Sequence, residues 1–137
     1  MKFSIVTPVL NGMPHIRRCV GYVTGQKGGG EAQHIVRDGG SLDGTAEWLG
    51  GQHGLSCESG ADGGMYEAIG MGWSAASGDV LSWLNCDEQY LPGTLETVAL
   101  AFNDNPECDA VTGDVIVVDS DGNALAACFD RNITEDL

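Results

Sequence analysis

Apolar residues along the chain recur in two alternating patterns, short runs typical of buried strands and longer stretches with helical spacing. The first run, FSIVTPV at residues 3–9, is rich in β-branched residues and leads into the turn sequence Asn-Gly at 11–12. Pro14 opens a stretch, residues 14–26, whose apolar residues lie at helical spacing. The start of the chain therefore predicts a strand, a turn and a helix.

The same succession repeats along the rest of the chain. Further strands are predicted at residues 32–40, 55–59, 79–85 and 109–119, and further helices at 45–49, 65–76 and 93–103. Strands that alternate with helices predict parallel β-α-β units in a sheet that is covered on both faces. DSDGN at residues 119–123 predicts a hairpin turn into ALAACF, and GGG at 28–30 predicts a plain connecting loop.

Length and composition predict one domain, residues 1–137. A chain of 137 residues with 42% hydrophobic content can bury one core but not two. The apolar stretches are too short to span a bilayer, and the first residues lack the apolar region of a signal peptide. We therefore expect a cytoplasmic protein without a membrane span.

The charge balance is strongly acidic. Twenty Asp and Glu residues against six Lys and Arg residues give a formal net charge of −14. Such a charge opposes binding to nucleic-acid backbones and to anionic membrane surfaces. It also means that a phosphate ligand would need a positive group, such as a metal ion, to offset the repulsion.

The five cysteines and three histidines show no ligand spacing. The cysteines are widely scattered without a C-x-x-C pair, which favours reduced structural thiols over a zinc or redox site. GMGWSA at residues 70–75 fits a dinucleotide fingerprint, but no strand precedes it, so a mid-helix position is expected. DSDGN with Asp130 is interpreted as a turn and not as a calcium loop, because its glycine is misplaced.

Polar residues follow four consecutive predicted strands. In open α/β sheets the ligand binds beyond the carboxyl ends of the strands, near the point where the strand order reverses. The candidates at this edge, in chain order, are Thr7 with Asn11, Asp38, Glu58 with Asp62, and Asp87 with Glu88.

The motifs at these strand ends resemble those of the family 2 glycosyltransferases with the GT-A fold. SIVTPVLNG is similar to the opening strand and turn of the family, and HIVRDGGSLDGT is similar to its second-strand motif. ESGADGGMYEAIGMGWSAASGDVLSWLNCDE resembles the segment that ends in the Asn-x-Asp-Asp metal motif. The resemblance covers about residues 3–119 and implies a GT-A (Rossmann-like) α/β fold with an open, mostly parallel sheet. It further implies an inverting transfer of a sugar from a UDP, GDP or dTDP donor to a saccharide or lipid-linked acceptor hydroxyl.

The resemblance places a divalent metal at the end of the fourth strand. Asp87 is the expected ligand of Mg²⁺ or Mn²⁺, and Glu88 stands where the family usually has a second Asp. Such an ion acts as a Lewis acid that stabilises the departing diphosphate. The alternative is that Asp87 and Glu88 only start a turn or cap the following helix.

The resemblance also implies a set of nucleotide contacts. Asp38 is expected to contact the base or the ribose, and the alternative is a turn role in DGGS. Thr7 is expected to contact the base through its backbone and its hydroxyl. Pro8 and Asn11, from the same strand and turn, are further expected nucleotide contacts. Leu10 stands where the family often has Tyr, so a stacking contact at this position is in doubt.

Two acidic residues before the second and third predicted helices have different expected roles. Asp62 is expected near the sugar or the ribose, with a helix N-cap as its alternative. Asp43, in SLDGT, is interpreted as a structural residue at the start of a helix.

The catalytic base is not identified. In the family it lies well downstream of the metal motif, so we expect it beyond Leu137 and expect the domain to be incomplete at its C-terminus. TEDL at 134–137 is interpreted as a helix cap. An alternative function is a nucleotide-sugar-binding module without transfer activity. An incomplete domain would leave a sheet edge uncovered, so we also expect a homodimer.

Overall fold

The structure of the chain, a computed structural model, describes residues 1–128. The chain separates into two compact units, Met1–Leu100 and Ala101–Leu137. The interpretations of Asp130 and of TEDL lie outside the described residues. Whether residues 1–137 form one incomplete domain stays a prediction.

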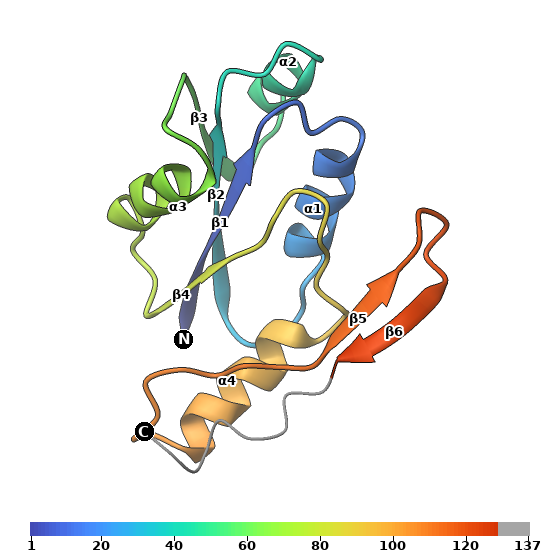
Figure 1. Cartoon of the computed structure of the whole chain (residues 1–137). Helices are drawn as coiled ribbons and strands as arrows, with labels where there is room; N and C mark the ends of the chain where they lie inside the picture. The colour runs from blue at the N-terminus through green and yellow to red at the C-terminus, as the bar shows by residue number, and fades with distance from the viewer. Residues whose placement is uncertain (129–137) are drawn as a thin grey trace. The chain divides into compact units, whose positions relative to one another are not determined.

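The first unit is built on a four-stranded parallel sheet with the strand order β3-β2-β1-β4 (Figure 1). The strands are β1 Lys2–Val9, β2 Glu31–Asp38, β3 Leu55–Ser59 and β4 Val80–Trp83. All three strand pairs are parallel. Since β2 and β3 lie on one side of β1 and β4 lies on the other, the strand order reverses at β1.

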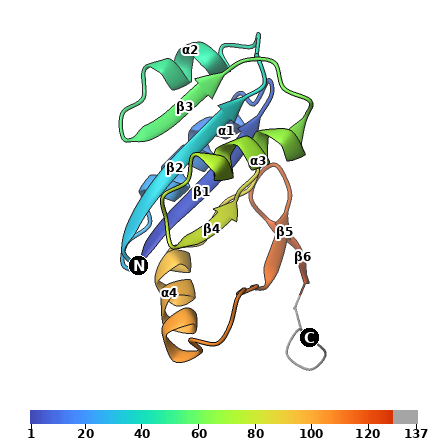
Figure 2. The same ribbon diagram turned by 90° about the vertical axis from the view of Figure 1, so that its left-hand side faces the viewer.

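Helices cover both faces of this sheet, as predicted. They are α1 His15–Thr24, α2 Thr45–Gly50, α3 Met65–Ser74 and α4 Thr94–Asp104. Figure 2 shows α1 and α3 on opposite faces of the sheet. Among residues 1–128, no helix is both long enough and apolar enough to cross a membrane.

The core lies mainly between the sheet and α1. Phe3 and Ile5 of β1 pack with Cys19 and Val23 of α1 and with the first turns of α4. A second cluster joins Val9 and Val36 to residues of α1 and α2. Side chains alternate along β1, so the residues of this strand with odd numbers face α1.

On the other face, α3 approaches β1 closely through Gly72. A Cβ atom at Gly72 would lie 2.5 Å from Cγ1 of Val6, which is closer than carbon atoms can pack. GMGWSA is helical over residues 70–74, as predicted, but it forms the second half of α3, and Ala75 is the C-cap. Gly72, the third residue of this motif, allows α3 to pack closely against β1.

GGG at 28–30 lies in the loop that connects α1 to β2, as predicted, but this loop also has a packing role. All three glycines have positive φ angles, of 76°, 72° and 121°, and pack tightly against neighbouring chain. A Cβ at Gly29 would lie 2.6 Å from the backbone of Leu95, at the start of α4. Gln26, just before the glycines, accepts a hydrogen bond from the Leu95 N–H and donates one to Leu91 O. This segment therefore holds the N-terminus of α4.

The second unit contains an antiparallel hairpin of β5 Val115–Val118 and β6 Ala124–Cys128. The strand predicted at 109–119 is thus shorter and belongs to a separate two-stranded sheet. Asp119 Oδ1 accepts hydrogen bonds from the N–H groups of Asp121 and Asn123, each at 2.9 Å. The hairpin turn at DSDGN is confirmed.

A buried histidine connects β2 to β1. His34 of β2 is buried, and its Nε2 lies 2.8 Å from Thr7 Oγ1. Its Nδ1 has no hydrogen-bond partner in the part of the chain that the structure describes. Burial disfavours the charged ring and lowers the pKa of His34 from 6.5 to about 4.

We predict that His34 makes the fold sensitive to acid. Below pH 6.5 the ring of His34 is protonated in the unfolded chain, whereas in the folded chain it stays neutral down to about pH 4. Folding stability therefore falls over this window, by about 3 kcal/mol at most. Urea unfolding of the wild type and of His34→Val at pH 7 and pH 4 measures the effect. Between pH 7 and pH 4 the free energy of unfolding of the wild type should fall by that amount relative to that of His34→Val, and a difference that does not change with pH would refute the prediction.

Candidate functional site

A cavity of about 380 Å³ lies at the carboxyl ends of the strands of the first unit. Its walls come from the ends of β1 and β2, from the start of α3 and from the segment after β4. This position beside β1 is where the strand order reverses, as the topology of an open α/β sheet predicts. The lining residues are Pro8, Val9, Leu10, Gly39, Asp62, Gly64, Met65, Ala68, Asn85, Cys86 and Asp87.

Three of the site residues predicted from the sequence meet in this cavity. Pro8 lines it from β1, Asp62 from the segment before α3, and Asp87 from the segment after β4. Leu10, Met65 and Ala68 supply apolar surface. A cavity with apolar walls and a few convergent polar groups is typical of small-molecule sites.

Asp62 serves the fold and also faces the cavity. Its Oδ1 accepts a hydrogen bond of 2.9 Å from the N–H of Gly64, at the start of α3. A Cβ at Gly39 would lie 3.5 Å from both carboxylate oxygens and 3.6 Å from Leu10 Cδ1. Gly39 therefore leaves a slot between the acid and the leucine. The N-cap of α3 is Gly64, without a side-chain cap, so the N-cap alternative for Asp62 was wrong, and its contact with the sugar or the ribose stays a prediction.

Asp38 acts as the organiser of a turn. It is 2% exposed, and it does not line the cavity. Its oxygens accept hydrogen bonds from the N–H and the hydroxyl of Ser41, and Oδ2 accepts one from Ser59 Oγ at 2.5 Å. The turn role weighed for Asp38 is confirmed, and its contact with a nucleotide stays a prediction.

The segments after β1 and β2 are joined by four hydrogen bonds, which we call the clasp. In each bond a backbone N–H of one segment donates to a side-chain oxygen of the other. The bonds are Asn11 N to Ser41 Oγ (2.7 Å), Leu42 N to Asn11 Oδ1 (2.9 Å), Gly12 N to Thr45 Oγ1 (3.1 Å) and Met13 N to Asp43 Oδ2 (2.9 Å).

The clasp accounts for Asn11 and Asp43. The side chain of Asn11 belongs to the clasp and does not line the cavity, so its nucleotide contact stays a prediction. The structural interpretation of Asp43 is confirmed. Hydrogen bonds, above all from the side chain of Thr45, hold the pKa of Asp43 below its usual value.

Thr7 points away from the cavity. Its side chain is fully buried, and Oγ1 lies 2.8 Å from His34 Nε2 and 3.6 Å from Cys19 Sγ of α1. The hydroxyl is therefore engaged in the core on the α1 face. A backbone contact of Thr7 with a base stays a prediction.

Asp87 and Glu88 differ in what their carboxylates can bind. Glu88 Oε1 accepts a hydrogen bond from Asn85 Nδ2 at 3.0 Å, and Oε2 accepts one from Asn85 N at 3.1 Å. Glu88 thus closes a turn, which was the alternative to a metal ligand. Asp87 lines the cavity.

A divalent metal fits this site with Asp87 as its protein ligand. Residues 1–128 contain no group of three or more His, Cys, Asp or Glu side chains placed to hold an ion. Mg²⁺ and Mn²⁺ usually take only one or two protein carboxylates, together with phosphate oxygens and waters. In this conformation Asp87 can supply such a ligand, whereas each oxygen of Glu88 already accepts a hydrogen bond from Asn85, and the role of Glu88 as a second ligand stays a prediction.

Cys86 is a cavity residue that sequence reasoning took for a scattered structural thiol. Burial, and then the charge of Asp87, raise the pKa of Cys86. A Cβ at Gly12 would lie 2.3 Å from Val9 Cγ2 and 3.3 Å from Cys86 Sγ. The contact with Val9 excludes a side chain at position 12, and the segment after β1 lies close to Cys86 at this point. In the sequence, Cys86 stands between Asn85 and Asp87 at the end of the fourth predicted strand, and this spacing already indicates that it lies at the same edge of the sheet as Asp87.

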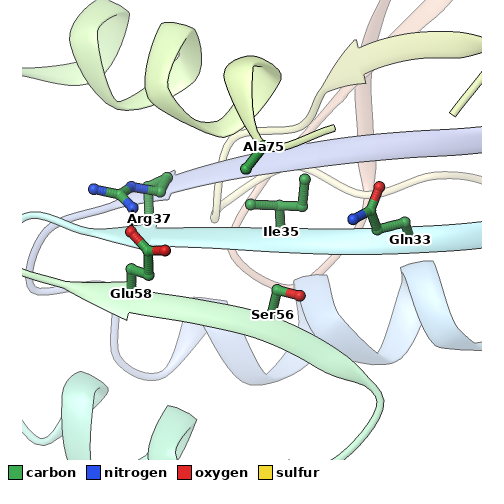
Figure 3. A pocket seen from close by; sticks show the side chains of 6 residues that line it. All are labelled: Gln33, Ile35, Arg37, Ser56, Glu58 and Ala75. Atoms are coloured by element: carbon green, nitrogen blue, oxygen red, sulfur yellow. Dashed lines mark hydrogen bonds and ion pairs between the residues drawn. The ribbon is translucent and has the colours of Figure 1, made fainter. Parts of the chain in front are cut away.

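A second, smaller cavity of about 130 Å³ lies on β2 and β3 beside the end of α3 (Figure 3). Figure 3 shows Arg37 and Glu58 turned toward each other, and the two side chains form an ion pair. Glu58, an acid noted at the end of the third predicted strand, is therefore committed to Arg37. The positive charge of Arg37 is in turn balanced by the carboxylate of Glu58.

Comparison with known proteins places the chain among glycosyltransferases. The family model described as Glycosyl transferase family 2 matches residues 4–129. The uncharacterised glycosyltransferase Rv1514c of Mycobacterium tuberculosis is 35% identical over 94 residues, which are 64% of this chain and 34% of that protein. The PGL/p-HBAD biosynthesis glycosyltransferase Rv2957 of the same species is 32% identical over 123 residues, 84% of this chain and 47% of that protein. The chain thus spans between a third and a half of the length of these relatives.

Solved glycosyltransferase structures share the fold. Staphylococcus aureus TarS 1–349 in complex with UDP-GlcNAc has a TM-score of 0.70 at 20% identity, over 77% of this chain and 32% of that chain. The mannosyltransferase PcManGT from Pyrobaculum calidifontis, in complex with GDP-Man and Mn²⁺, has a TM-score of 0.63 at 20% identity, over 85% of this chain and 35% of that chain. These likenesses confirm the predicted GT-A α/β fold class.

We predict that Asp38→Ala destabilises the fold by on the order of 3 kcal/mol. Hydrogen bonds to a charged group each contribute about 1.5–3 kcal/mol, and the substitution removes the acceptor of the buried donors of Ser41 and of the exposed hydroxyl of Ser59. Urea unfolding measures the effect, with Asp104→Ala, an exposed acid at the end of α4, as the matched control. A loss no larger than that of the control would contradict the role of Asp38 in the turn.

Proposed function

Because this chain belongs to glycosyl transferase family 2, we propose that it binds a nucleoside-diphosphate sugar at its carboxyl edge and serves transfer of the sugar to an acceptor hydroxyl. The observation that carries the proposal is the meeting of Pro8, Asp62 and Asp87 in one cavity. The complexes of TarS with UDP-GlcNAc and of PcManGT with GDP-Man support a donor of this chemical class.

The cavity offers complementary surfaces for such a donor. The apolar side chains of Leu10, Met65 and Ala68 suit the faces of a planar base or a sugar ring, and Asp62 can accept hydrogen bonds from hydroxyl groups. Asp87 would hold Mg²⁺ or Mn²⁺, which neutralises the charge of the leaving diphosphate. A chain with a net charge of −14 has particular need of this cation.

In the proposed reaction the acceptor hydroxyl attacks the anomeric carbon as the diphosphate leaves, with inversion at that carbon. A carboxylate takes the hydroxyl proton. Asp62 and Asp87 face the donor in this scheme, so we assign the base to neither and place it outside residues 1–128. We further propose that the acceptor is a saccharide or a lipid-linked group, that the protein is cytoplasmic and that it forms a homodimer.

A donor-binding module without transfer activity is the second candidate function. This candidate rests on the assignment of both acids of the cavity, Asp62 and Asp87, to the donor, because a positioned base contributes roughly 10²–10⁴ in rate. A radiolabelled donor incubated with saccharide and lipid acceptors separates the two candidates. Transfer product supports the enzyme, whereas binding with donor hydrolysis alone supports the module.

We predict that nucleoside-diphosphate binding depends on a divalent metal and on Asp87. Calorimetric titration of UDP and GDP should show tight binding with Mn²⁺ and weak binding with chelator, because the acidic chain otherwise repels the diphosphate. Asp87→Asn should bind weakly in both conditions.

Asp104→Asn, which removes one negative charge far along the chain, serves as the control and should retain the metal effect. Equal affinity of the wild type with Mn²⁺ and with chelator would contradict the metal assignment.

A further inference from the structure

Trp73 of α3 and Trp83 of β4 lie in contact at the surface of the first unit. Their ring centroids are 6.0 Å apart with an interplanar angle of 68°, an edge-to-face arrangement. Trp73 is 36% exposed and Trp83 is 50% exposed. Tryptophan usually buries most of its large apolar area, so two exposed rings side by side indicate a surface that binds a ligand or a partner.

Contacts within the protein hold this pair of rings in place. The indole N–H of Trp73 donates a hydrogen bond of 3.2 Å to the backbone oxygen of Ser82 in β4. Leu81, which is 48% exposed, stands two residues before Trp83 and therefore on the same face of the strand. We call Trp73, Leu81 and Trp83 the tryptophan platform. Because its rings are positioned before a ligand arrives, binding requires little further ordering.

The tryptophan platform lies on the two elements that also lead into the cavity. On α3, Ala68 lines the cavity, and Trp73 follows five residues later, about 8 Å along the helix axis. After β4, Asn85 lines the cavity, and Trp83 stands two residues before it, at most about 7 Å away along the chain. A ligand that lies on the platform therefore has one end within reach of the cavity.

A neutral saccharide suits the chemistry of this surface. The faces of a sugar ring carry C–H groups that pack on aromatic rings, while the hydroxyl groups at its rim stay hydrated on an open surface. An alkyl chain on the same open surface would leave much of its area in water. A neutral sugar also avoids the repulsion that a net charge of −14 exerts on an anionic ligand.

An added β-strand fits the platform less well. β4 pairs with β1 on one side, and a further strand would need those backbone groups of β4 that do not pair with β1. The carbonyl oxygen of Ser82 already accepts the hydrogen bond from Trp73. The side chain of Trp73 therefore competes with a strand at this position.

We propose that the tryptophan platform is the acceptor subsite and that the acceptor is a neutral saccharide, whose terminal sugar enters the cavity while the preceding sugars stack on Trp83 and Trp73. The inference rests on the proposed function, because it takes the cavity to be the donor site. It narrows the acceptor from a saccharide or a lipid-linked group to a saccharide.

The experiment measures binding of cellohexaose, chitohexaose, maltohexaose and mannohexaose to the full chain, in chelator and with UDP or GDP and Mn²⁺. At least one of them should bind the wild type, and Trp83→Ala and Trp73→Ala should each weaken that binding by roughly 10-fold, the value of a lost aromatic contact. Trp83→Tyr, which keeps an aromatic ring, should retain part of the affinity. Trp48→Phe, which changes the tryptophan that packs on the core beside α2, is the matched control and should bind like the wild type.

Donor binding separates this inference from the proposed function. UDP or GDP with Mn²⁺ should bind Trp83→Ala as tightly as the wild type. A wild type that binds neither nucleotide would overturn the proposed function. A wild type that binds a nucleotide but no saccharide of the panel, or that binds saccharide no better than Trp83→Ala does, would overturn the inference alone.

Hydroxyl-radical footprinting of the wild type needs no variant. The bound saccharide should slow oxidation of Trp83 and Trp73 several-fold, located by mass spectrometry, and should leave Trp48 unchanged. A saccharide that binds without protecting Trp83 would overturn the inference.

Two further measurements test other occupants of the platform. Sedimentation would reveal a dimer of the wild type that dissociates in Trp83→Ala, and flotation with phosphatidylcholine vesicles would reveal lipid binding that the same variant loses. Either result would assign the platform to a second copy or to a lipid and overturn the saccharide assignment. Equal behaviour of the wild type and Trp83→Ala in both measurements supports it.

Discussion

The buried carboxylate of Asp38 is the contact on which the carboxyl edge of the sheet depends. It lies at the end of β2 and receives hydrogen bonds from Ser41 in the following segment and from Ser59 at the end of β3. The Ser41 hydroxyl that donates to Asp38 also accepts from the N–H of Asn11. One carboxylate thus ties together the ends of three strands. Since each hydrogen bond to a charged group is strong, the arrangement can hold a loop-rich edge in one shape.

The cavity follows from this arrangement. The clasp fixes the segment after β1, and a Cβ at Gly12 would lie only 3.3 Å from Cys86 Sγ, so the segments after β1 and β4 lie close together there. The segment after β4 is shaped separately by the turn between Asn85 and Glu88. Two independently stabilised segments and the start of α3 therefore enclose the space into which Asp62 and Asp87 face. Asp62 both lines the cavity and accepts a hydrogen bond from the start of α3, whereas Asp38 and Asp43 stabilise the segments around the cavity without lining it.

Much of the fold could be predicted from the sequence, because buried strands and amphipathic helices leave distinct periodicities. The edge of the sheet that carries Pro8, Asp62 and Asp87 followed from the same pattern and from the family resemblance. The direction of individual side chains did not follow. DGGS is equally compatible with an Asp38 that faces a ligand and with one that turns inward to Ser41. Glu88 beside Asp87 has the spacing of a metal pair, yet its carboxylate reaches back to Asn85. The alternation along β1 did carry the answer for Thr7, whose number has the same parity as those of the core residues Phe3 and Ile5.

The central claim is that the cavity beside β1 is the nucleotide site. A crystal structure of the chain with UDP or GDP and Mn²⁺ tests it most directly. The claim predicts density for the nucleoside between Leu10, Gly39 and Asp62, and an ion bound to Asp87 and to oxygens of the diphosphate. A nucleotide bound elsewhere, with this cavity filled only by water, would contradict it.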